Sequence, residues 1–412
     1  MEEWKSYKLD DVCDLIPGFA FKSGDFGDYT NKVIKIGDIQ PPYVNYSSMI
    51  GINIQPYDSN KLVKFLVKKG DFVLAMTGAT IGKIGKYINE TPAYLNQRVL
   101  LFKPHTDVNK DFIYFTLQSP SFQKYIINHI DSETAQPNIS GRSISGYEVY
   151  LPSRRKQDRI SNILISLDNK IELNNRINHN LEQQAQALYK SWFVDFEPFK
   201  DGKFVESEMG LIPEGWREGI LSELGDIVAG GTPSKTRPDY YIDHGIAWLT
   251  PKDLSIKCNK FTARGEIDIT ETGYKNSSAK LMPKGSVLFS SRAPIGYITI
   301  AKNDICTNQG FKSVVPTYAG TAYIYYWLLS NTENIEAQAS GSTFKEASVA
   351  LMKSFPALVP PKDILKSFEK ELKPILRKQE LIEEESSNAE QMRDTLLPRL
   401  MSGEFVFDDL TC

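Results

Sequence analysis

Two long stretches of the chain carry hydrophobic residues at alternating steps of four and three, which is the spacing of a coiled-coil seam. The first stretch follows Pro152-Ser153, where Ser153 suits a helix N-cap. The second follows Pro360-Pro361 and is expected to stop at Pro398 and Gly403. The first seam comprises Ile160, Leu164, Leu167, Ile171, Asn174, Asn178, Leu181, Ala185, Leu188 and Trp192, and the second comprises Phe368, Leu372, Ile375, Gln379, Ile382, Ser386, Ala389, Arg393 and Leu396.

Two helices of matched length in one chain are predicted to pair with each other. Because a globular segment separates them, the pairing is expected to be antiparallel, and about 35 residues would form a rod of roughly 50 Å. The polar seam residues Asn174, Asn178, Gln379 and Ser386 would weaken the pair but fix its register, while Arg393 also suits a solvated surface. The residues expected to hold the helices together are Ile160, Leu164, Leu167, Ile171, Leu181, Leu188, Phe368, Leu372, Ile375, Ile382 and Leu396.

Shorter patterns predict mixed α/β modules around these helices. Runs of β-branched and aromatic residues at 33–36, 72–75, 99–102, 286–289 and 297–300 alternate with turn residues and predict strands. Residues 109–129 and 319–338 are predicted to be helical. The expected fold class is α+β, with two mixed α/β modules separated by two long helices that pair as an antiparallel coiled coil.

The two halves of the sequence match at five ordered points, which predicts a pseudo-two-fold internal duplication. Trp4 and Trp216 are 212 residues apart, as are Asn96-Gln97 and Asn308-Gln309. A period this long indicates duplication of a whole domain with its helix rather than a solenoid repeat. The other matches are Leu9 with Leu221, Lys69-Gly70 with Lys284-Gly285, and Leu151-Pro152 with Val359-Pro360, and the predicted segments are 1–152, 153–200, 201–360 and 361–412.

Composition limits the classes of function. With 48 basic and 51 acidic residues among 412, the net charge is −3, so nucleic-acid binding would depend on local patches. The four cysteines, Cys13, Cys258, Cys306 and Cys412, form no Cys-x-x-Cys pair, which argues against a zinc site and a disulfide framework. A charged N-terminus and the lack of an apolar run of about 20 residues lead us to expect a soluble, cytoplasmic protein.

Candidate catalytic motifs are incomplete. Gln40-Pro41-Pro42-Tyr43 resembles the base-gripping loop of DNA amino-methyltransferases, but it begins with Gln and no glycine-rich turn for S-adenosylmethionine accompanies it. We therefore expect a turn. The segments 78–85 and 230–235 resemble phosphate loops without fitting their spacing and are also interpreted as tight turns.

No nucleophile and base can be nominated, and the four histidines, His105, His129, His179 and His244, contain no helical metal pair. The residues therefore favour a binding scaffold without catalytic or metal residues of its own. The alternatives are a self-contained adenine DNA methyltransferase and a coiled-coil protein adaptor without DNA specificity.

Several segments resemble the specificity subunits of type I restriction-modification systems. Ala187 to Pro198 with Gly210 to Trp216 resembles their central conserved region, and Thr395 to Glu404 resembles their distal conserved region. Within the modules, the segments similar to common features of their target recognition domains are Gly230 to Lys235, Ser290 to Gly296, Asn308-Gln309, Gln136 to Ser140 and Gly341 to Phe344.

This resemblance implies that each module is a target recognition domain that reads one half of a bipartite DNA site. The helices would set the distance between the halves and dock two modification (methyltransferase) subunits. Those partners would use S-adenosylmethionine to methylate a flipped adenine, and restriction (endonuclease and translocase) subunits would use ATP and Mg. The chain itself would bind no cofactor.

Base edges are read by Arg, Lys, Asn and Gln, and phosphates by Lys, Arg and hydroxyl groups. The candidates lie in loops between the predicted strands, in matching segments of the two modules. Because Asn96-Gln97 and Asn308-Gln309 are shared, their role is structural if the modules read different sequences. The predicted DNA-binding residues are Thr77, Lys83, Lys86, Asn96, Gln97, Arg98, Arg142, Lys235, Arg237, Lys252, Ser290, Arg292, Asn308, Gln309 and Lys345.

Overall fold

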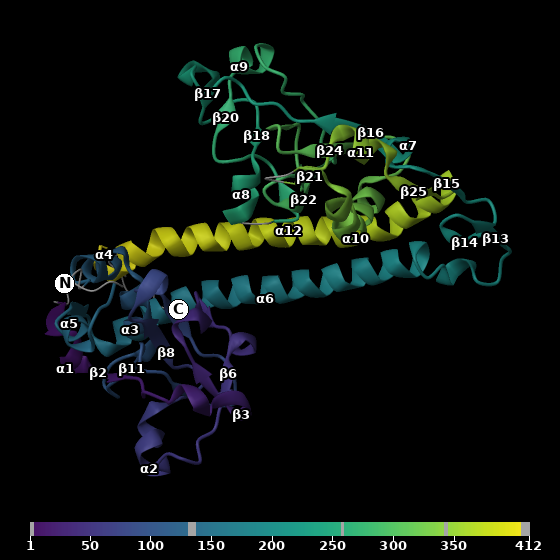
Figure 1. Cartoon of the computed structure of the whole chain (residues 1–412). Helices are drawn as coiled ribbons and strands as arrows, with labels where there is room; N and C mark the ends of the chain where they lie inside the picture. Colours follow the sequence, from purple (N-terminus) through teal and green to yellow (C-terminus); the bar gives the residue numbers. More distant parts are fainter. Residues whose placement is uncertain (1–3, 131–136, 257–258, 342–344, 405–412) are drawn as a thin grey trace. The chain divides into compact units, whose positions relative to one another are not determined.

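The computed structural model describes residues 4–130, 137–256, 259–341 and 345–404. Its internal contacts divide the chain into two units, Met1–Ile171 with Asn388–Cys412 (unit 1) and Glu172–Ser387 (unit 2). Both long helices pass from one unit to the other, so each unit contains a part of both (Figure 1). The sequence features Gln136, Cys258, residues 342–344 and Cys412 lie outside the described residues.

Unit 1 is built on a six-stranded sheet of order β2-β11-β8-β9-β5-β4. Successive residues of its central strands alternate between two cores, since Phe72 and Leu74 enter one and Val73 and Ala75 the other. The strands are β2 (Cys13–Pro17), β11 (Val99–Pro104), β8 (Phe72–Ala75), β9 (Ile84–Lys86), β5 (Tyr43–Val44) and β4 (Ile39–Gln40).

A smaller sheet of order β6-β3-β10-β7 belongs to the same unit, and β1 pairs with β12. The bounds are β6 (Ile50–Ile52), β3 (Phe26–Ile34), β10 (Ala93–Leu95), β7 (Leu66–Val67), β1 (Lys5–Lys8) and β12 (Glu148–Leu151). The helices are α1 (Leu9–Val12), α2 (Ser59–Leu62), α3 (Lys110–Gln118), α4 (Pro120–Asn128) and α5 (Gly141–Ser145).

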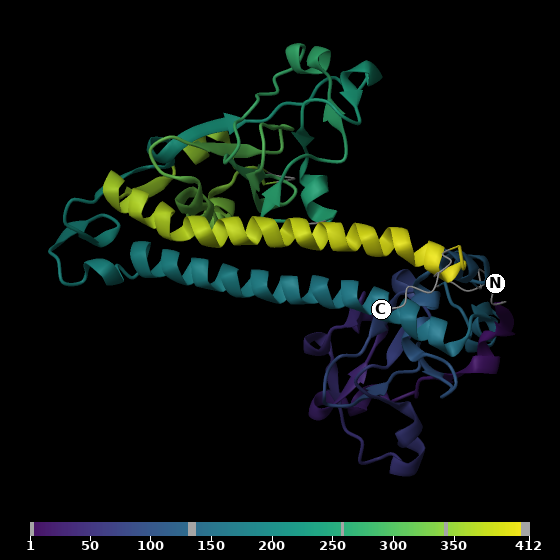
Figure 2. The ribbon, with the colours of Figure 1, turned by 180° about the vertical axis from the view of Figure 1, so that it is seen from behind.

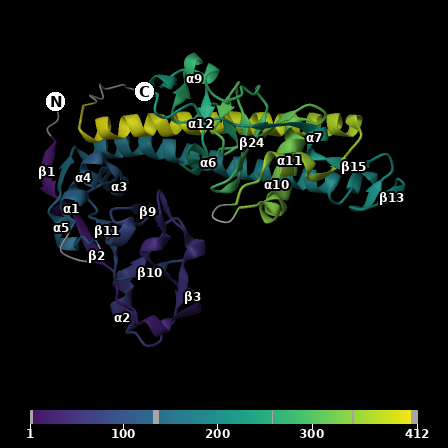
Figure 3. The same cartoon turned by 45° about the horizontal axis from the view of Figure 1, so that its top comes forward.

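Helix α3 packs its buried residues into the same core as the start of the first long helix, beside which it lies in Figure 3. The helical prediction over 109–129 is confirmed, but the segment is divided into two helices, since α3 ends at Gln118 and α4 begins at Pro120. The proline occupies the first position of α4, where its missing N–H costs nothing, and the Ser119 side chain caps the new helix.

Unit 2 repeats the sheet of unit 1, since its order β16-β24-β21-β22-β19 begins as β2-β11-β8-β9 does. The strands are β16 (Gly225–Ala229), β24 (Lys312–Pro316), β21 (Val287–Ser291), β22 (Ile295–Ala301) and β19 (Phe261–Thr262). Likewise β15 (Arg217–Ile220) pairs with β25 (Pro356–Val359), as β1 pairs with β12. The predicted duplication is therefore confirmed in topology.

The remaining pairs of unit 2 are β13 (Phe204–Ser207) with β14 (Gly210–Pro213), β17 (Tyr241–Ile242) with β20 (Asp268–Ile269), and β18 (Trp248–Leu249) with β23 (Cys306–Thr307). Its short helices are α7 (Leu221–Leu224), α8 (Pro251–Ile256), α9 (Glu271–Lys275) and α11 (Val349–Ser354). The longer α10 (Thr321–Gln338) matches the prediction over 319–338 and is buried along most of its first half.

The long helices α6 (Arg154–Phe193) and α12 (Lys362–Met401) begin where the sequence predicts. In unit 2, Asn174 contacts Glu385 and Tyr189 contacts Phe368, so the two segments run antiparallel. In unit 1, Arg393 donates to Asp168 across the two helices (3.1 Å), so it is an ion-pair residue. The predicted antiparallel pairing is confirmed.

The predicted apolar positions of the seam are buried or half-buried. Ile160, Leu164, Ile171, Phe368, Leu372 and Ile382 are buried, whereas Leu167, Leu181, Leu188, Ile375 and Leu396 are half-buried. Pro398 does not stop α12, which continues to Met401. The helix loses one hydrogen bond there, and the burial of Leu397 and Leu400 compensates. Pro374 also lies inside α12, which bends within its first third (Figure 2).

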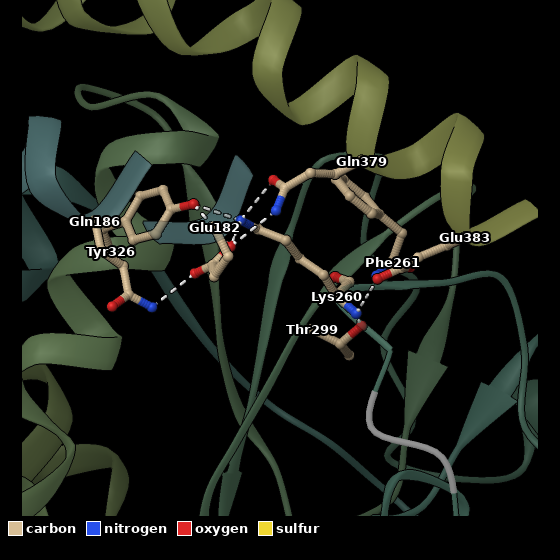
Figure 4. A network of polar contacts seen from close by, with 8 residues as sticks. All are labelled: Glu182, Gln186, Lys260, Phe261, Thr299, Tyr326, Gln379 and Glu383. Carbon is tan, nitrogen blue, oxygen red and sulfur yellow. Dashed lines mark hydrogen bonds and ion pairs between the residues drawn. The ribbon is translucent and has the colours of Figure 1, made fainter. Parts of the chain in front are cut away.

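A buried polar network joins the sheet of unit 2 to the helices (Figure 4). The Lys260 ammonium pairs with Glu182 of α6 (2.5 Å) and donates to Gln379 of α12 (2.9 Å) and to the Tyr326 hydroxyl of α10. The carboxylate of Glu383 accepts the backbone N–H groups of Lys260 and Phe261. The predicted seam residue Gln379 thus contacts Glu182 of the facing helix and Lys260 of the module.

Candidate nucleic-acid interface

A groove of about 850 Å³ in unit 2 gathers five of the predicted DNA-binding residues. They come from four separate segments of the chain, which the sheet brings together. The five are Lys235, Lys252, Arg292, Asn308 and Gln309. A cluster of donors and acceptors in one concave site is the arrangement that direct reading of a polar ligand requires.

Aromatic residues form one wall of this groove. The Trp248 indole N–H donates to the Gly231 carbonyl (3.1 Å), and the Tyr241 hydroxyl donates to the Pro233 carbonyl (2.6 Å). The two rings meet edge to face, 5.8 Å apart. These bonds hold the 230–235 segment beside the two rings, with Lys235 at the groove. The tight turn predicted over 230–235 lies at Lys235-Thr236, where the Arg237 N–H donates to the Ser234 carbonyl (3.2 Å).

The Asn308-Gln309 turn has a structural counterpart in unit 1. The Asn308 carbonyl accepts the Phe311 N–H (3.2 Å), as the Asn96 carbonyl accepts the Val99 N–H (2.9 Å). A Cβ at Gly230 would lie 2.0 Å from the Asn308 oxygen, and one at Gly18 would lie 2.0 Å from the Asn96 oxygen. Only glycine fits there. This close approach gives the shared Asn-Gln pairs a structural reason.

The side chains of the turn differ in exposure. The Asn308 amide oxygen accepts the Gly310 N–H (2.8 Å), so it stabilises the turn. Gln309 is exposed and accepts a hydrogen bond from the Thr232 hydroxyl. Gln309 therefore presents its amide group to the groove.

The loop between β21 and β22 carries Arg292 into the groove. Ser290 is buried beneath this loop, where its hydroxyl donates to the Pro294 carbonyl and accepts the Tyr297 N–H, both at 2.8 Å. Ser290 thus supports the loop rather than lining the groove. Arg292 pairs with Glu346 (3.5 Å), which also pairs with the buried Lys312 (2.9 Å).

The other candidates of unit 2 lie around the groove or apart from it. Lys252 pairs with Glu266 at the groove (3.2 Å). Arg237 makes two bonds of 2.9 Å to Asp239 and lies over the Tyr240 ring. The ammonium of Lys345 lies 3.4 Å from the Glu336 carbonyl. Neither Arg237 nor Lys345 lines the groove.

In unit 1 the candidates fall into three places. The Met76 N–H donates to the Arg98 carbonyl (3.0 Å), so the 96–98 turn adjoins the loop that carries Thr77 and Lys83. Thr77 is buried and donates to the Pro137 carbonyl (3.1 Å), whereas Lys83, Gln97 and Arg98 are exposed and Asn96 is half-buried.

Two further candidates of unit 1 lie outside this pair of loops. Lys86 turns to α3, where it pairs with Asp111 (2.5 Å). Arg142 is exposed on α5. The exposed candidates of unit 1 are therefore Lys83, Gln97 and Arg98 on adjoining loops, and Arg142 apart from them on α5.

Several expectations about reactive groups can be compared with the described residues. Residues 39–44 form the hairpin of β4 and β5, so Pro41-Pro42 lies at the predicted turn. Cys13 and Cys306 are free and buried, and burial raises the pKa of each thiol to about 12. Among residues 4–130, 137–256, 259–341 and 345–404, no three His, Cys, Asp or Glu side chains converge as metal ligands do. The same ranges contain no helix long and apolar enough to cross a membrane.

Four residues of the groove or its support escaped the sequence reasoning. Trp248 and Tyr241, which directly follows Tyr240, belong to no sequence motif that separates them from core positions. Lys312 and Glu346 are 34 residues apart and meet only through the sheet. The positive backbone φ of Ala293 (52°) also has no sequence signal.

Two copies of one sheet-and-helix module, each continuous with a long helix, define a duplicated two-module protein. The family described as type I restriction modification DNA specificity domain matches residues 1–183 and 213–391. The chain belongs to this family.

Relatives and a solved structure agree with this assignment. The type I restriction enzyme HindI specificity subunit of Haemophilus influenzae is 26% identical over 469 residues, covering 98% of this chain and 100% of that one. The MjaIX specificity subunit of Methanocaldococcus jannaschii is 38% identical over 154 residues, which cover 37% of this chain and 35% of that one. The crystal structure of the S subunit of a type I restriction-modification system from M. genitalium has the same fold, with a TM-score of 0.64, 14% identity and coverage of 100% and 97%.

Proposed function

We propose that this chain is the DNA sequence-recognition subunit of a type I restriction-modification enzyme. Each module reads one half of a bipartite site, and the paired helices fix the spacing of the halves. The observation that carries this proposal is the duplication, in which two modules share a backbone topology but present different side chains in their loops. Two related readers with unlike surfaces suit two unlike half-sites.

The chemistry belongs to partner subunits. Two modification subunits dock on the helices, bind S-adenosylmethionine and methylate an adenine in each half-site, and restriction subunits supply cleavage driven by ATP with Mg. The chain supplies no catalytic residue and binds no cofactor itself. Because its substrate is cellular DNA, the complex works in the cytoplasm.

The charge of the chain agrees with such a division of labour. Its groove is lined by three basic residues, Lys235, Lys252 and Arg292, and by three acidic ones, Asp243, Asp253 and Glu266. A balanced groove suits the reading of hydrogen-bonding groups more than attraction of phosphates. Partners that bind the same duplex can supply the phosphate contacts that dominate affinity.

The test is to express this chain with its modification subunits in a host lacking methylated adenine and to sequence the methylated positions. We expect one bipartite motif, and no methylation when either component is expressed alone. Replacing residues 213–359 by the corresponding module of a relative should change one half of the motif only. Methylation by the chain alone would favour a self-contained methyltransferase, and an assembled complex without sequence preference would favour a protein adaptor.

A further inference from the structure

Three charged residues linked in series, Lys312, Glu346 and Arg292, support the groove of unit 2. Lys312, the first residue of β24, has a side chain only 9% exposed. Its ammonium donates to Glu346 (2.9 Å), to the Gln309 carbonyl (3.2 Å) and to the Ser291 hydroxyl (3.3 Å). Three acceptors satisfy its three donors. Lys312 therefore ties together the three segments that carry Gln309, Arg292 and Glu346.

Glu346 transmits this fixed position to Arg292. One carboxylate oxygen accepts from the buried Lys312, and the other lies 3.5 Å from an Arg292 terminal nitrogen. That distance is an ion pair but too long for a strong hydrogen bond. The guanidinium, whose side chain is 37% exposed, lines the groove. It is thus restrained in position where it lines the groove.

The loop that presents Arg292 carries backbone strain. Ala293 has a φ of 52°, a region that side chains with a Cβ adopt at a cost. The equivalent residue of unit 1 is Gly78, with a φ of 72°, where no such cost arises. Strain of this kind is held by the surrounding structure and is concentrated at functional sites.

The same backbone positions in unit 1 lack these charges. The Met76 carbonyl accepts the Ile139 N–H, as the Ser291 carbonyl accepts the Ala347 N–H (both 2.9 Å). This pairing makes Thr77 the counterpart of Arg292 and Asn138 the counterpart of Glu346. Leu100 takes the place of Lys312, because each is the fourth residue after the asparagine of its Asn-Gln turn, Asn96 in unit 1 and Asn308 in unit 2. Of the two modules, only the second therefore carries this series of three charged residues.

We propose that Arg292 reads a guanine in the half-site of the second module and that Glu346 and Lys312 are its positioning residues. This inference rests on the proposed function. The guanidinium fork matches the O6 and N7 acceptors on the major-groove edge of guanine. A phosphate would be repelled by the Glu346 carboxylate beside Arg292, so a base edge suits this pair better. Thr77, the counterpart of Arg292 in the first module, is buried and donates to the Pro137 carbonyl, so it does not supply an equivalent reader at the matching step.

The test uses the assembled methyltransferase, formed by this chain with its modification subunits, and duplexes that carry each base pair at each position of both half-sites. Arg292→Gln should lower the preference for one G·C pair of the second half-site by about 10- to 100-fold and leave the first half-site unchanged. Arg292→Lys, which keeps the charge but lacks the fork, should lose most of the same preference.

Glu346→Gln tests the positioning role. It should weaken the preference at the same base pair, and adding it to Arg292→Gln should cause no further change there. Lys235→Gln is the matched control, a cation at the same groove, for which we expect affinity to fall equally for all sequences. Circular dichroism and urea midpoints establish that each variant is folded.

The alternatives give different results. If Arg292→Gln weakens binding equally for all sequences, Arg292 contacts phosphate and the proposal is wrong. No change at any position, a change in the first half-site, or a second half-site without a G·C pair would also overturn it. A wild-type complex that methylates without any bipartite motif would instead refute the proposed function itself.

Discussion

Replacement of Glu182 by Gln should destabilise unit 2 more than replacement of its partner Lys260 by Met. The Lys260 side chain is 6% exposed and that of Glu182 is 24% exposed. Burial lowers the pKa of Lys260, and the charge of Glu182 offsets part of that shift. Burial also opposes ionisation of Glu182, but Lys260 and Gln379 outweigh it and lower the pKa of that carboxyl.

The asymmetry follows from what each variant leaves behind. Glu182→Gln leaves a buried ammonium without its nearest counter-charge, and such losses cost about 3–5 kcal/mol. Because Glu182 keeps some contact with water, we expect about 2–4 kcal/mol here. Lys260→Met leaves a carboxylate that is partly hydrated and still accepts from Gln379 (3.0 Å) and Gln186 (2.9 Å). Met fills much of the vacated space, so this variant should cost about 1 kcal/mol.

The pH dependence gives a second readout. The pKa of Lys260 in the folded protein lies below its ordinary value of 10.5, so the unfolded chain binds more protons between the two values. The free energy of unfolding therefore rises as pH increases through that window. Glu182→Gln lowers the folded-state pKa further and extends the window downward, so its deficit should be smaller at pH 9 than at pH 7.

Urea unfolding of the two single variants and the double variant measures these effects, with Glu266→Gln as the control. Glu266 belongs to an exposed ion pair with Lys252, so its loss should leave the midpoint unchanged. If Lys260→Met costs as much as Glu182→Gln, or if the deficit of Glu182→Gln is the same at pH 9, burial of the ammonium is not the cause.

Three further predictions concern stability and spacing. Asp71→Asn should cost about 1–2 kcal/mol at pH 7, because it removes charge-assisted hydrogen bonds but leaves Lys103 and Lys110 partly hydrated. Burial opposes ionisation of Asp71, but the ion pairs with these two lysines outweigh it and lower the pKa of Asp71 from 3.8. That stabilisation is present above pH 3.8 and is lost as pH falls through the folded-state value, so urea midpoints of the variant and wild type should converge below pH 3.8; a constant difference would contradict it. Gly230→Ala places a Cβ 2.0 Å from a carbonyl oxygen and should cost about 3 kcal/mol. The control is Gly24→Ala, at an exposed glycine where an added Cβ meets no atom within 4 Å, and an unchanged midpoint of Gly230→Ala would show that the turn can move. Shortening one long helix by a turn should alter the spacer in the methylated motif and leave both half-sites intact; altered half-site bases with the old spacer would refute the role of the helices as a ruler.

The fold was predictable where periodicity is long or repeated. The seams of α6 and α12 and the strands Phe72–Ala75 and Val99–Pro104 follow directly from side-chain spacing. The ends of helices at prolines were predicted least well, because proline can begin a helix, end it or lie inside it. Pro120 begins a helix at its first position, whereas Pro398 lies inside one that tertiary packing maintains.

The candidate site was predictable in its loops but not in its supporting residues. Arg292, Asn308 and Gln309 came from segments with recognisable patterns, and the groove brings them together. Lys312 lies on a strand whose hydrophobic pattern is typical of the core, and Glu346 lies in a segment without a regular hydrophobic pattern. Their ion pair depends on strand order, which long-range contacts decide and local sequence does not encode.

The duplication separates structural positions from those that can carry specificity. Residues that both modules share, such as Gly18 and Gly230, allow two backbone segments to approach closely, and both modules need this approach in order to fold. A shared residue of this kind gives both modules the same local surface and cannot distinguish two half-sites. Specificity must therefore lie where equivalent backbone carries unlike chemistry, and Thr77 opposite Arg292 is the clearest such difference on the loops between matching strands.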